Sequence, residues 1–272
     1  MWIDTHCHLD AHEFGGPAGS LEIAARAGQA GVVNIVIPAV ARDNFDVVRE
    51  LAHAAPNTSY ALGIHPIYVP QASDDDLDAL RELVAHSIDD PRFVAIGEVG
   101  LDFFIPLLCE PDMRVKQERF FREQLRIARD FGLPVLTHVR RSQDQVLKHV
   151  RQVRPAGGIA HAFNGSFQQA QAFIDLGWHL GFGGAMTFTR ALQIRRLASE
   201  LPLDAIVLET DAPDISPSWI HPGRNSPEQL PAIGKVLADL RAIPEHEVRL
   251  ASGRSALAAL PRLAPLLAHR SG

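Results

Sequence analysis

The chain has 272 residues, of which 46% are hydrophobic and 21% are charged, proportions that are ordinary for a globular protein with a substantial core. Its formal net charge of −6 gives no overall attraction for nucleic acid, so a polyanion has to be held by a local basic patch and by metal ions. The two cysteines, Cys7 and Cys109, exclude a disulfide framework and a cysteine-type zinc finger.

Signals for export or membrane insertion are missing from the sequence. The N-terminal residues run straight into a strand pattern, and no uninterrupted apolar stretch reaches membrane-spanning length. We therefore expect a cytoplasmic protein that does not insert into a membrane. No feature of the sequence indicates an obligate protein partner.

Short apolar or β-branched runs recur along the chain and alternate with stretches of helical periodicity. The eight expected strands span residues 2–8, 32–39, 59–65, 93–99, 134–139, 158–163, 178–185 and 205–210. The expected helices between them span residues 21–28, 43–54, 74–88, 112–131, 143–153, 166–176 and 189–200, and two more follow near 227–240 and 244–260.

This alternation predicts parallel pairing of the strands, and eight strand–helix units predict an α/β fold of the closed (β/α)8 TIM barrel type. A doubly wound open sheet is the competing layout. It has fewer strands and usually carries a glycine-rich nucleotide-binding turn, which does not follow the first strand here. No linker, low-complexity tract or charge run divides the chain, so we expect one domain over residues 1–272.

His6 and His8 stand at the end of the first expected strand. Alternate side chains of a strand share a face, so this His-x-His pattern presents two imidazoles side by side, which is half of a transition-metal site. By the same alternation, Cys7 points the other way and is expected to pack in the core. Taken alone, the histidine pair is also compatible with a tag remnant or with chance.

Further residues that can bind a metal stand at the ends of later strands. They are His65, Glu98, His138, His161 and Asp211. In a barrel these strand ends converge on one mouth, where active sites are built. Any one of these residues could instead be a hydrogen-bonded histidine of the core or a buried structural carboxylate. Several metal-binding residues on one rim favour a metal centre.

The number of donors favours two metal ions, since even without His65 the four other histidines and the two carboxylates exceed what one tetrahedral ion needs. Glu98, midway around the rim, is the natural bridge between the ions. Asp211, beside the first strand in a closed barrel, can bind the first metal and accept a proton from its water. Coordination lowers the pKa of that water toward about 7, so we expect hydrolysis by metal-bound hydroxide.

Other residues near the predicted mouth suit a substrate. His65 is either a metal ligand or, as we favour, a residue that supports a ligand from behind or donates to a substrate phosphate. Arg140 either clamps a phosphate or forms a surface salt bridge, whereas Arg141 is expected to be solvated. Trp219 either stacks on a base or packs over the barrel.

Two further carboxylates are candidates for positioning roles. Asp102 is expected to orient loop backbone or a ligand histidine, and Glu209 to do the same or to pair with an arginine such as Arg224. The remaining histidines, including His269, are expected to be ordinary.

The chain carries several motifs in order: His6-x-His8, Gly97-Glu98-Val99-Gly100-Leu101-Asp102, His138-x-Arg140, His161-x-Phe163-x-Gly165, Glu209-Thr210-Asp211-x-Pro213 and Arg224-Asn225. Together they resemble the TatD family of metal-dependent hydrolases, within the amidohydrolase superfamily, and most of all its YjjV-like branch. The resemblance extends from residue 2 to about residue 260. It implies a TIM-barrel hydrolase with two divalent ions. By this resemblance, His6, His8, Glu98 and Asp211 serve one ion, and Glu98, His138 and His161 serve the other.

The resemblance also implies Mg²⁺-dependent 3′→5′ exodeoxyribonuclease activity on DNA 3′ ends, an ester-bond hydrolysis of EC class 3.1, with His65 on the substrate side. Phe103 stands where a tyrosine is common, and Ala162 and Asn164 replace a frequent cysteine and serine. None of these three is a ligand, so the departures bear on the substrate and not on the metal site.

Two other functions stay open. The same hydroxide can cleave a carboxylic ester or an amide, such as an aminoacyl ester on tRNA or a small cyclic amide, because specificity lies in the loops. A non-catalytic barrel that binds metal for structure is the third reading. Histidine-rich ligation favours Zn²⁺, Mn²⁺ or Ni²⁺, whereas the resemblance implies Mg²⁺.

Overall fold

The computed structural model describes residues 1–268. The strands are β1 (Trp2–Asp4), β2 (Val32–Pro38), β3 (Thr58–Leu62), β4 (Phe93–Asp102), β5 (Val135–Arg140), β6 (Gly158–His161), β7 (Trp178–Phe182) and β8 (Ile206–Leu208). The α-helices are α1 (Gly16–Gln29), α2 (Phe45–Ala54), α3 (Asp74–Ser87), α4 (Pro111–Asp130), α5 (Gln143–Val153), α6 (Phe167–Ile174), α7 (Leu192–Glu200), α8 (Leu230–Arg241), α9 (Glu245–Ala259) and α10 (Leu263–Ala268). Short 3₁₀ turns are η1 (His12–Phe14), η2 (Arg42–Asn44), η3 (Pro66–Tyr68), η4 (Pro106–Cys109), η5 (Gly184–Thr187), η6 (Leu203–Ala205) and η7 (Pro227–Gln229).

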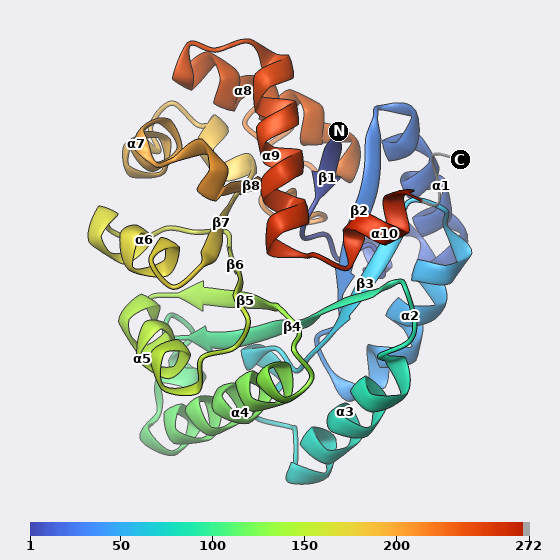
Figure 1. The fold of residues 1–272 in the computed structure, drawn as a ribbon, viewed down its shortest axis with the longest axis vertical. Helices are drawn as coiled ribbons and strands as arrows, with labels where there is room; N and C mark the ends of the chain where they lie inside the picture. Colours follow the sequence, from blue (N-terminus) through green and yellow to red (C-terminus); the bar gives the residue numbers. More distant parts are fainter. Residues whose placement is uncertain (269–272) are drawn as a thin grey trace.

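The strands form one parallel sheet whose order, β1 to β8, follows the chain. Figure 1 shows α1 to α8 around the outside of this sheet, with α9 and α10 lying across its centre. Between β8 and β1, single main-chain hydrogen bonds take the place of a ladder: Thr5 donates to Leu208 at 3.2 Å, and Asp211 donates to His6 at 2.9 Å. The predicted (β/α)8 TIM barrel is confirmed as a nearly closed barrel.

Several strands end earlier than predicted. β1 ends at Asp4 and not at residue 8, and β8 ends at Leu208 and not at residue 210. The physical reason is the Asp4 side chain, whose Oδ1 accepts hydrogen bonds from the main-chain nitrogens of His6 at 3.3 Å and Thr210 at 3.0 Å. His6, His8 and Asp211 therefore lie on irregular backbone just beyond β1 and β8, whereas Glu98 and His138 lie within β4 and β5.

The predicted helices are all present: α5 has the predicted bounds, and the others differ at one or both ends. In α5, the buried residues Val146, Leu147, Val150 and Val153 recur at helical spacing, so one face of the helix packs on the barrel. α10 was not predicted, because six residues are too few to show a helical period.

The interior of the barrel is filled by its own apolar cluster, separate from the layer between strands and helices. The strands contribute Ile3, Val36, Ala61, Val94, Ala95, Leu136, Ile159 and Val207, and the C-terminal segment contributes Ala256, Ala259, Leu260, Leu263 and Leu266. The Arg262 side chain donates to the main-chain oxygens of Ile88 at 2.7 Å and Phe93 at 2.5 Å. The C-terminal segment thus closes one end of the barrel.

Strand alternation continues this interior face to the opposite end. Two residues beyond Leu136 comes His138, and two beyond Ile159 comes His161. Residues two apart in a strand point to the same side, so apolar side chains at one end of the barrel give way to imidazoles at the other. Cys7, predicted for the core, is fully buried in the outer apolar cluster.

No helix within residues 1–268 is long and apolar enough to cross a membrane. A single domain over residues 1–272 stays a prediction. The segment 269–272, which includes the predicted ordinary histidine His269, lies outside the residues that the structure describes.

Replacing Leu263 with alanine tests the role of the C-terminal segment. Because Leu263 is fully buried in the barrel interior, Leu263→Ala is expected to lower the free energy of unfolding by about 2–5 kcal/mol. Leu250→Ala, on the exposed side of α9, is the matched control and should change it by less than about 0.5 kcal/mol. Denaturant unfolding measures both, and equal stabilities would contradict the packing role.

Candidate metal centre

The predicted site residues converge on one pocket of about 1090 Å³. His8, His65, Glu98, His138, Arg140, His161, Glu209 and Asp211 line it. His6 lies buried behind them, in contact with Glu98. Asp102 is also buried and contacts His138. The structure therefore brings together all ten residues singled out in the sequence.

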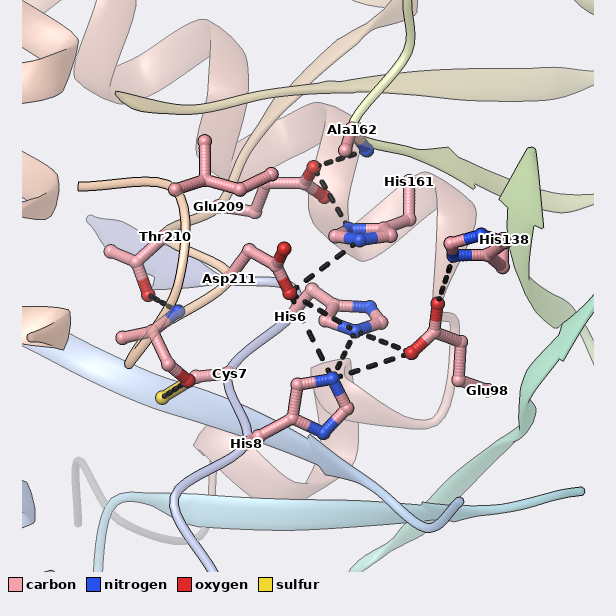
Figure 2. A network of polar contacts seen from close by, with 12 residues as sticks. His6, Cys7, His8, Glu98, His138, His161, Ala162, Glu209, Thr210 and Asp211 are labelled. Atoms are coloured by element: carbon pink, nitrogen blue, oxygen red, sulfur yellow. Dashed lines mark hydrogen bonds and ion pairs between the residues drawn. The ribbon is translucent and has the colours of Figure 1, made fainter. Parts of the chain in front are cut away.

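Glu98, on β4, contacts His6 and His8 on one side and His138 on the other (Figure 2). Its Oε2 is 3.2 Å from His6 Nε2 and 3.3 Å from His8 Nε2. Its Oε1 is 3.1 Å from His138 Nδ1 and 3.4 Å from His65 Nε2. Each oxygen of one carboxylate thus faces a different pair of histidines.

Asp211 faces the same histidines from the other side. Its Oδ1 is 3.8 Å from the Nε2 atoms of both His6 and His8, and 3.5 Å from His161 Nε2. The rings of His6 and His161 are stacked, with centroids 3.6 Å apart. Asp211 has a φ of 56°, a left-handed conformation that is uncommon for residues other than glycine and recurs at functional sites.

Two buried carboxylates hold the far sides of two histidine rings. Asp102 Oδ2 is 3.1 Å from His138 Nε2, and Glu209 Oε1 is 3.0 Å from His161 Nδ1. A proton held between Asp102 and His138 Nε2 leaves His138 Nδ1, which faces the pocket, free to bind a metal. The contact of Glu209 with His161 Nδ1 is an ion pair, and His161 Nε2 is directed at Asp211. A side chain at Gly181 would collide with the Glu209 carboxylate, so the glycine makes room for it.

These contacts answer two questions that the sequence left open. Asp102 orients a histidine and also loop backbone, since its Oδ1 accepts hydrogen bonds from the nitrogens of Phe104 at 2.8 Å and Ile105 at 3.1 Å. Glu209 contacts His161 and the nitrogen of Ala162, at 2.5 Å, whereas Arg224 donates to the main-chain oxygen of Glu13.

His65 has the opposite arrangement to His138 and His161. Its Nδ1 accepts a hydrogen bond from the main-chain nitrogen of Ile67 at 3.1 Å, so in the neutral ring the proton sits on Nε2, which faces Glu98. Burial lowers the pKa of His65, against the attraction of Glu98, which favours this neutral form. His65 is therefore set up as a hydrogen-bond donor toward the pocket.

Asp4 is a functional position that sequence reasoning missed. Its carboxylate accepts hydrogen bonds from Thr210 Oγ1 at 2.6 Å and from the main-chain nitrogens of Thr210 and His6, which joins the segments after β1 and β8. Burial raises the pKa of Asp4 to about 7, against the hydrogen bonds from Thr210. The available signal was an acidic residue directly after the apolar residues Trp2 and Ile3, within a predicted strand.

Opposite charges compensate one another inside the centre. Burial opposes ionisation of Glu98, but His65 and His6 outweigh it and hold the pKa of that carboxyl well below its usual range. Burial raises the pKa of Asp211 to about 6 despite the attraction of His161 and His8. Burial opposes protonation of His161, but attraction by the carboxylates of Glu209 and Asp211 outweighs it and raises the pKa of His161 to about 10.

The donors fit divalent metal ions in kind, since imidazole nitrogens and carboxylate oxygens are the ligands of transition-metal and hydrolytic sites. Within residues 1–268 they fall into three groups, each with ligand atoms within 4.8 Å of one another. The groups are His6, His161 and Asp211; His6, His8 and Glu98; and His65, Glu98 and His138. The last group contains His65, where the family resemblance implies His161.

Comparison with known proteins relates the chain to metal-dependent hydrolases. The chain matches the family model of TatD related DNases over residues 3–258. It is 39% identical over 249 residues to YjjV of Escherichia coli K12, an uncharacterized metal-dependent hydrolase, with 91% of this chain and 93% of the relative covered. Another uncharacterized metal-dependent hydrolase, from Haemophilus influenzae, is 35% identical over 251 residues, covering 91% and 95%.

Solved structures agree in fold. The crystal structure of YjjV, a TatD homologue from Escherichia coli K12, matches with a TM-score of 0.88 at 35% identity, covering 96% of this chain and 98% of that one. A hydrolase of the TatD family from Entamoeba histolytica shares the fold, with a TM-score of 0.80, 19% identity, and 95% and 97% of the two chains covered. With the family model, the close relatives and the fold in agreement, the chain belongs to the TatD family of metal-dependent hydrolases.

Proposed function

We propose that this protein is a divalent-metal-dependent phosphodiesterase that removes nucleotides from the 3′ end of DNA, with a binuclear metal centre. The relatives are named metal-dependent hydrolases, and the family description, TatD related DNase, favours DNA as the substrate. Mg²⁺, Mn²⁺ and Zn²⁺ are the candidate ions. A cytoplasmic location stays a prediction.

The observation that carries the proposal is the position of Glu98. A carboxylate whose two oxygens face two separate histidine pairs is suited to bridge two ions. We assign His6, His8 and Asp211 to one ion, with Glu98. For the second ion we assign His138 and Glu98, with His161 as the family resemblance implies, although His161 lies beside His6 and Asp211 in the structure. His65 is left out because the Ile67 hydrogen bond uses its Nδ1 lone pair.

Two bound ions would lower the pKa of a coordinated water molecule toward neutral pH and would offset the negative charge of a phosphate. Asp211 is the residue that accepts the proton, since its carboxylate is 14% exposed, lines the pocket and lies beside His6 and His8. His65 donates a hydrogen bond to a phosphate oxygen through Nε2. Arg140, which lines the same pocket and has a half-exposed side chain, binds a phosphate.

The second candidate function is hydrolysis of a carboxylic ester or an amide at the same metal centre. The ligands do not separate it from phosphodiester cleavage, because the nucleophile is common to both. A panel of DNA, aryl esters and amides, each with Mg²⁺, Mn²⁺ or Zn²⁺, distinguishes them.

Metal-stripped protein tests the central assignment. Resupplied with a divalent ion, the wild type should remove nucleotides stepwise from the 3′ end of a labelled single strand. Glu98→Ala should lose the activity and bind fewer ions, whereas Glu13→Ala, at the pocket rim, should retain both. Metal content and gel electrophoresis of the products are the measurements. If the wild type binds two ions and cleaves no DNA, the substrate is a carboxylic ester or an amide and not DNA.

Asp211→Asn tests the proton acceptor. The amide keeps the size of the side chain but cannot take a proton, so turnover is expected to fall by about 10²–10⁴-fold with the fold intact. Asp214→Asn, on the same loop and lining the same pocket, should keep wild-type turnover. Activity that survives in Asp211→Asn would exclude this role, and circular dichroism checks the fold.

Glu209→Gln tests the orientation of His161. Loss of the carboxylate that holds His161 Nδ1 is expected to weaken binding of one of the two ions by about 10–100-fold. Calorimetric titration of the metal-stripped protein with Mn²⁺ gives both affinities. Two unchanged affinities would show that Glu209 has no part in metal binding.

A further inference from the structure

An exposed aromatic ring with two arginines over it lies on one wall of the pocket. Phe104 follows β4 and is 44% exposed. The guanidinium carbon of Arg140 is 3.9 Å from the centre of the Phe104 ring, and that of Arg141 is 4.6 Å from it. All three residues line the pocket that contains Glu98. We call this group the Phe104 stack.

The backbone explains why two successive arginines reach one ring. Arg140 is the last residue of β5, and neighbouring side chains of a strand normally point to opposite faces. Arg141 has a φ of 55°, in the left-handed region, so the alternation breaks at this residue. A bulky residue in this conformation is uncommon, and such positions cluster at ligand-binding sites.

The stack is joined to the metal centre through Asp102. One oxygen of this carboxylate accepts the main-chain hydrogen bond of Phe104, and the other contacts His138. The position of the ring relative to the centre is therefore fixed by a buried group and not by a free loop.

The charge of the stack is available to a ligand. Arg141 has no ion-pair partner among residues 1–268, and the acidic contact of Arg140 is Asp102 at the long distance of 3.8 Å. Guanidinium groups bind phosphate oxygens through paired hydrogen bonds, and both guanidinium planes and aromatic rings stack on nucleobases.

The size of the pocket leaves room for more than one substrate unit. Its volume of about 1090 Å³ is at the upper end of the range of about 300–1000 Å³ that holds one drug-sized ligand. A second exposed ring, Tyr68 on η3, lines the same pocket and is 44% exposed.

We propose that the Phe104 stack is a subsite for the nucleotide next to the one being removed. A base of the single strand stacks on the ring and its covering guanidiniums, and Arg141 binds the adjoining phosphate. This inference rests on the proposed function, because it supposes a polynucleotide substrate. It predicts that the protein recognises a strand through the nucleotide upstream of the scissile bond and not through the terminal unit alone.

The test compares two substrates that differ in the upstream nucleotide. A short 3′-labelled single-stranded oligonucleotide occupies the stack, whereas the p-nitrophenyl ester of thymidine 5′-phosphate has no further base. Phe104→Ala and Arg141→Ala should each raise KM for the oligonucleotide by about tenfold. KM for the aryl ester should stay the same in both variants. Phe104→Tyr, which keeps an aromatic ring, should have the wild-type KM for the oligonucleotide.

Trp219→Ala is the matched control. Trp219 is 45% exposed, close to the exposure of Phe104, but it donates to Gln229 and is not among the residues that line this pocket. Both of its KM values should equal those of the wild type. Binding of the same oligonucleotide, carrying a fluorescent label, is measured in parallel. EDTA is present to stop metal-dependent cleavage. Phe104→Ala should weaken this binding about tenfold.

The outcomes separate this inference from the proposed function. DNA cleavage with an unchanged oligonucleotide KM in Phe104→Ala overturns the subsite and leaves the nuclease function standing. Binding that depends on Phe104 without DNA cleavage supports the subsite and overturns the nuclease function. Neither binding nor cleavage by the wild type overturns both.

Discussion

The buried Glu98 carboxylate is the group on which the candidate site depends. A carboxylate with a side chain 2% exposed is stable only where donors surround it, and four imidazole nitrogens lie within 3.4 Å of its oxygens. These imidazoles come from the segments after β1 and β3 and from β5. The barrel places them around a residue of β4 because all of its strands end at one mouth.

The same strands contribute apolar packing at one end of the barrel and candidate metal ligands at the other. At one end, Leu136 and Ile159 meet the C-terminal segment and exclude water. Two residues further on, His138 and His161 face the pocket. Since a one-residue slip in register would exchange inward and outward side chains, packing of the apolar end also fixes the direction of the metal-binding side chains. Stability and the site are therefore coupled through strand register.

Second-layer carboxylates decide how each histidine presents its nitrogens. Asp102 and Glu209 hold the far nitrogens of His138 and His161, whereas a main-chain N–H occupies Nδ1 of His65. The three histidines differ in the nitrogen that faces the pocket: in His65 it carries the proton, whereas in His138 and His161 the carboxylates favour the proton on the far nitrogen. This separates two candidate ligands from a candidate donor. Asp102 also fixes Phe104, so the centre and one wall of the pocket share a single buried acid.

The sequence by itself determined the barrel and the set of residues at its mouth, because both depend on local patterns: strand–helix alternation, and donors such as His6, Glu98 and Asp211 where apolar runs end. It did not reveal where the strands end, the role of Asp4, or the pairing of Glu209 with His161. Arg141 over Phe104 was equally hidden. Those features join residues far apart in the chain or depend on one backbone torsion, and only tertiary packing sets such distances and angles.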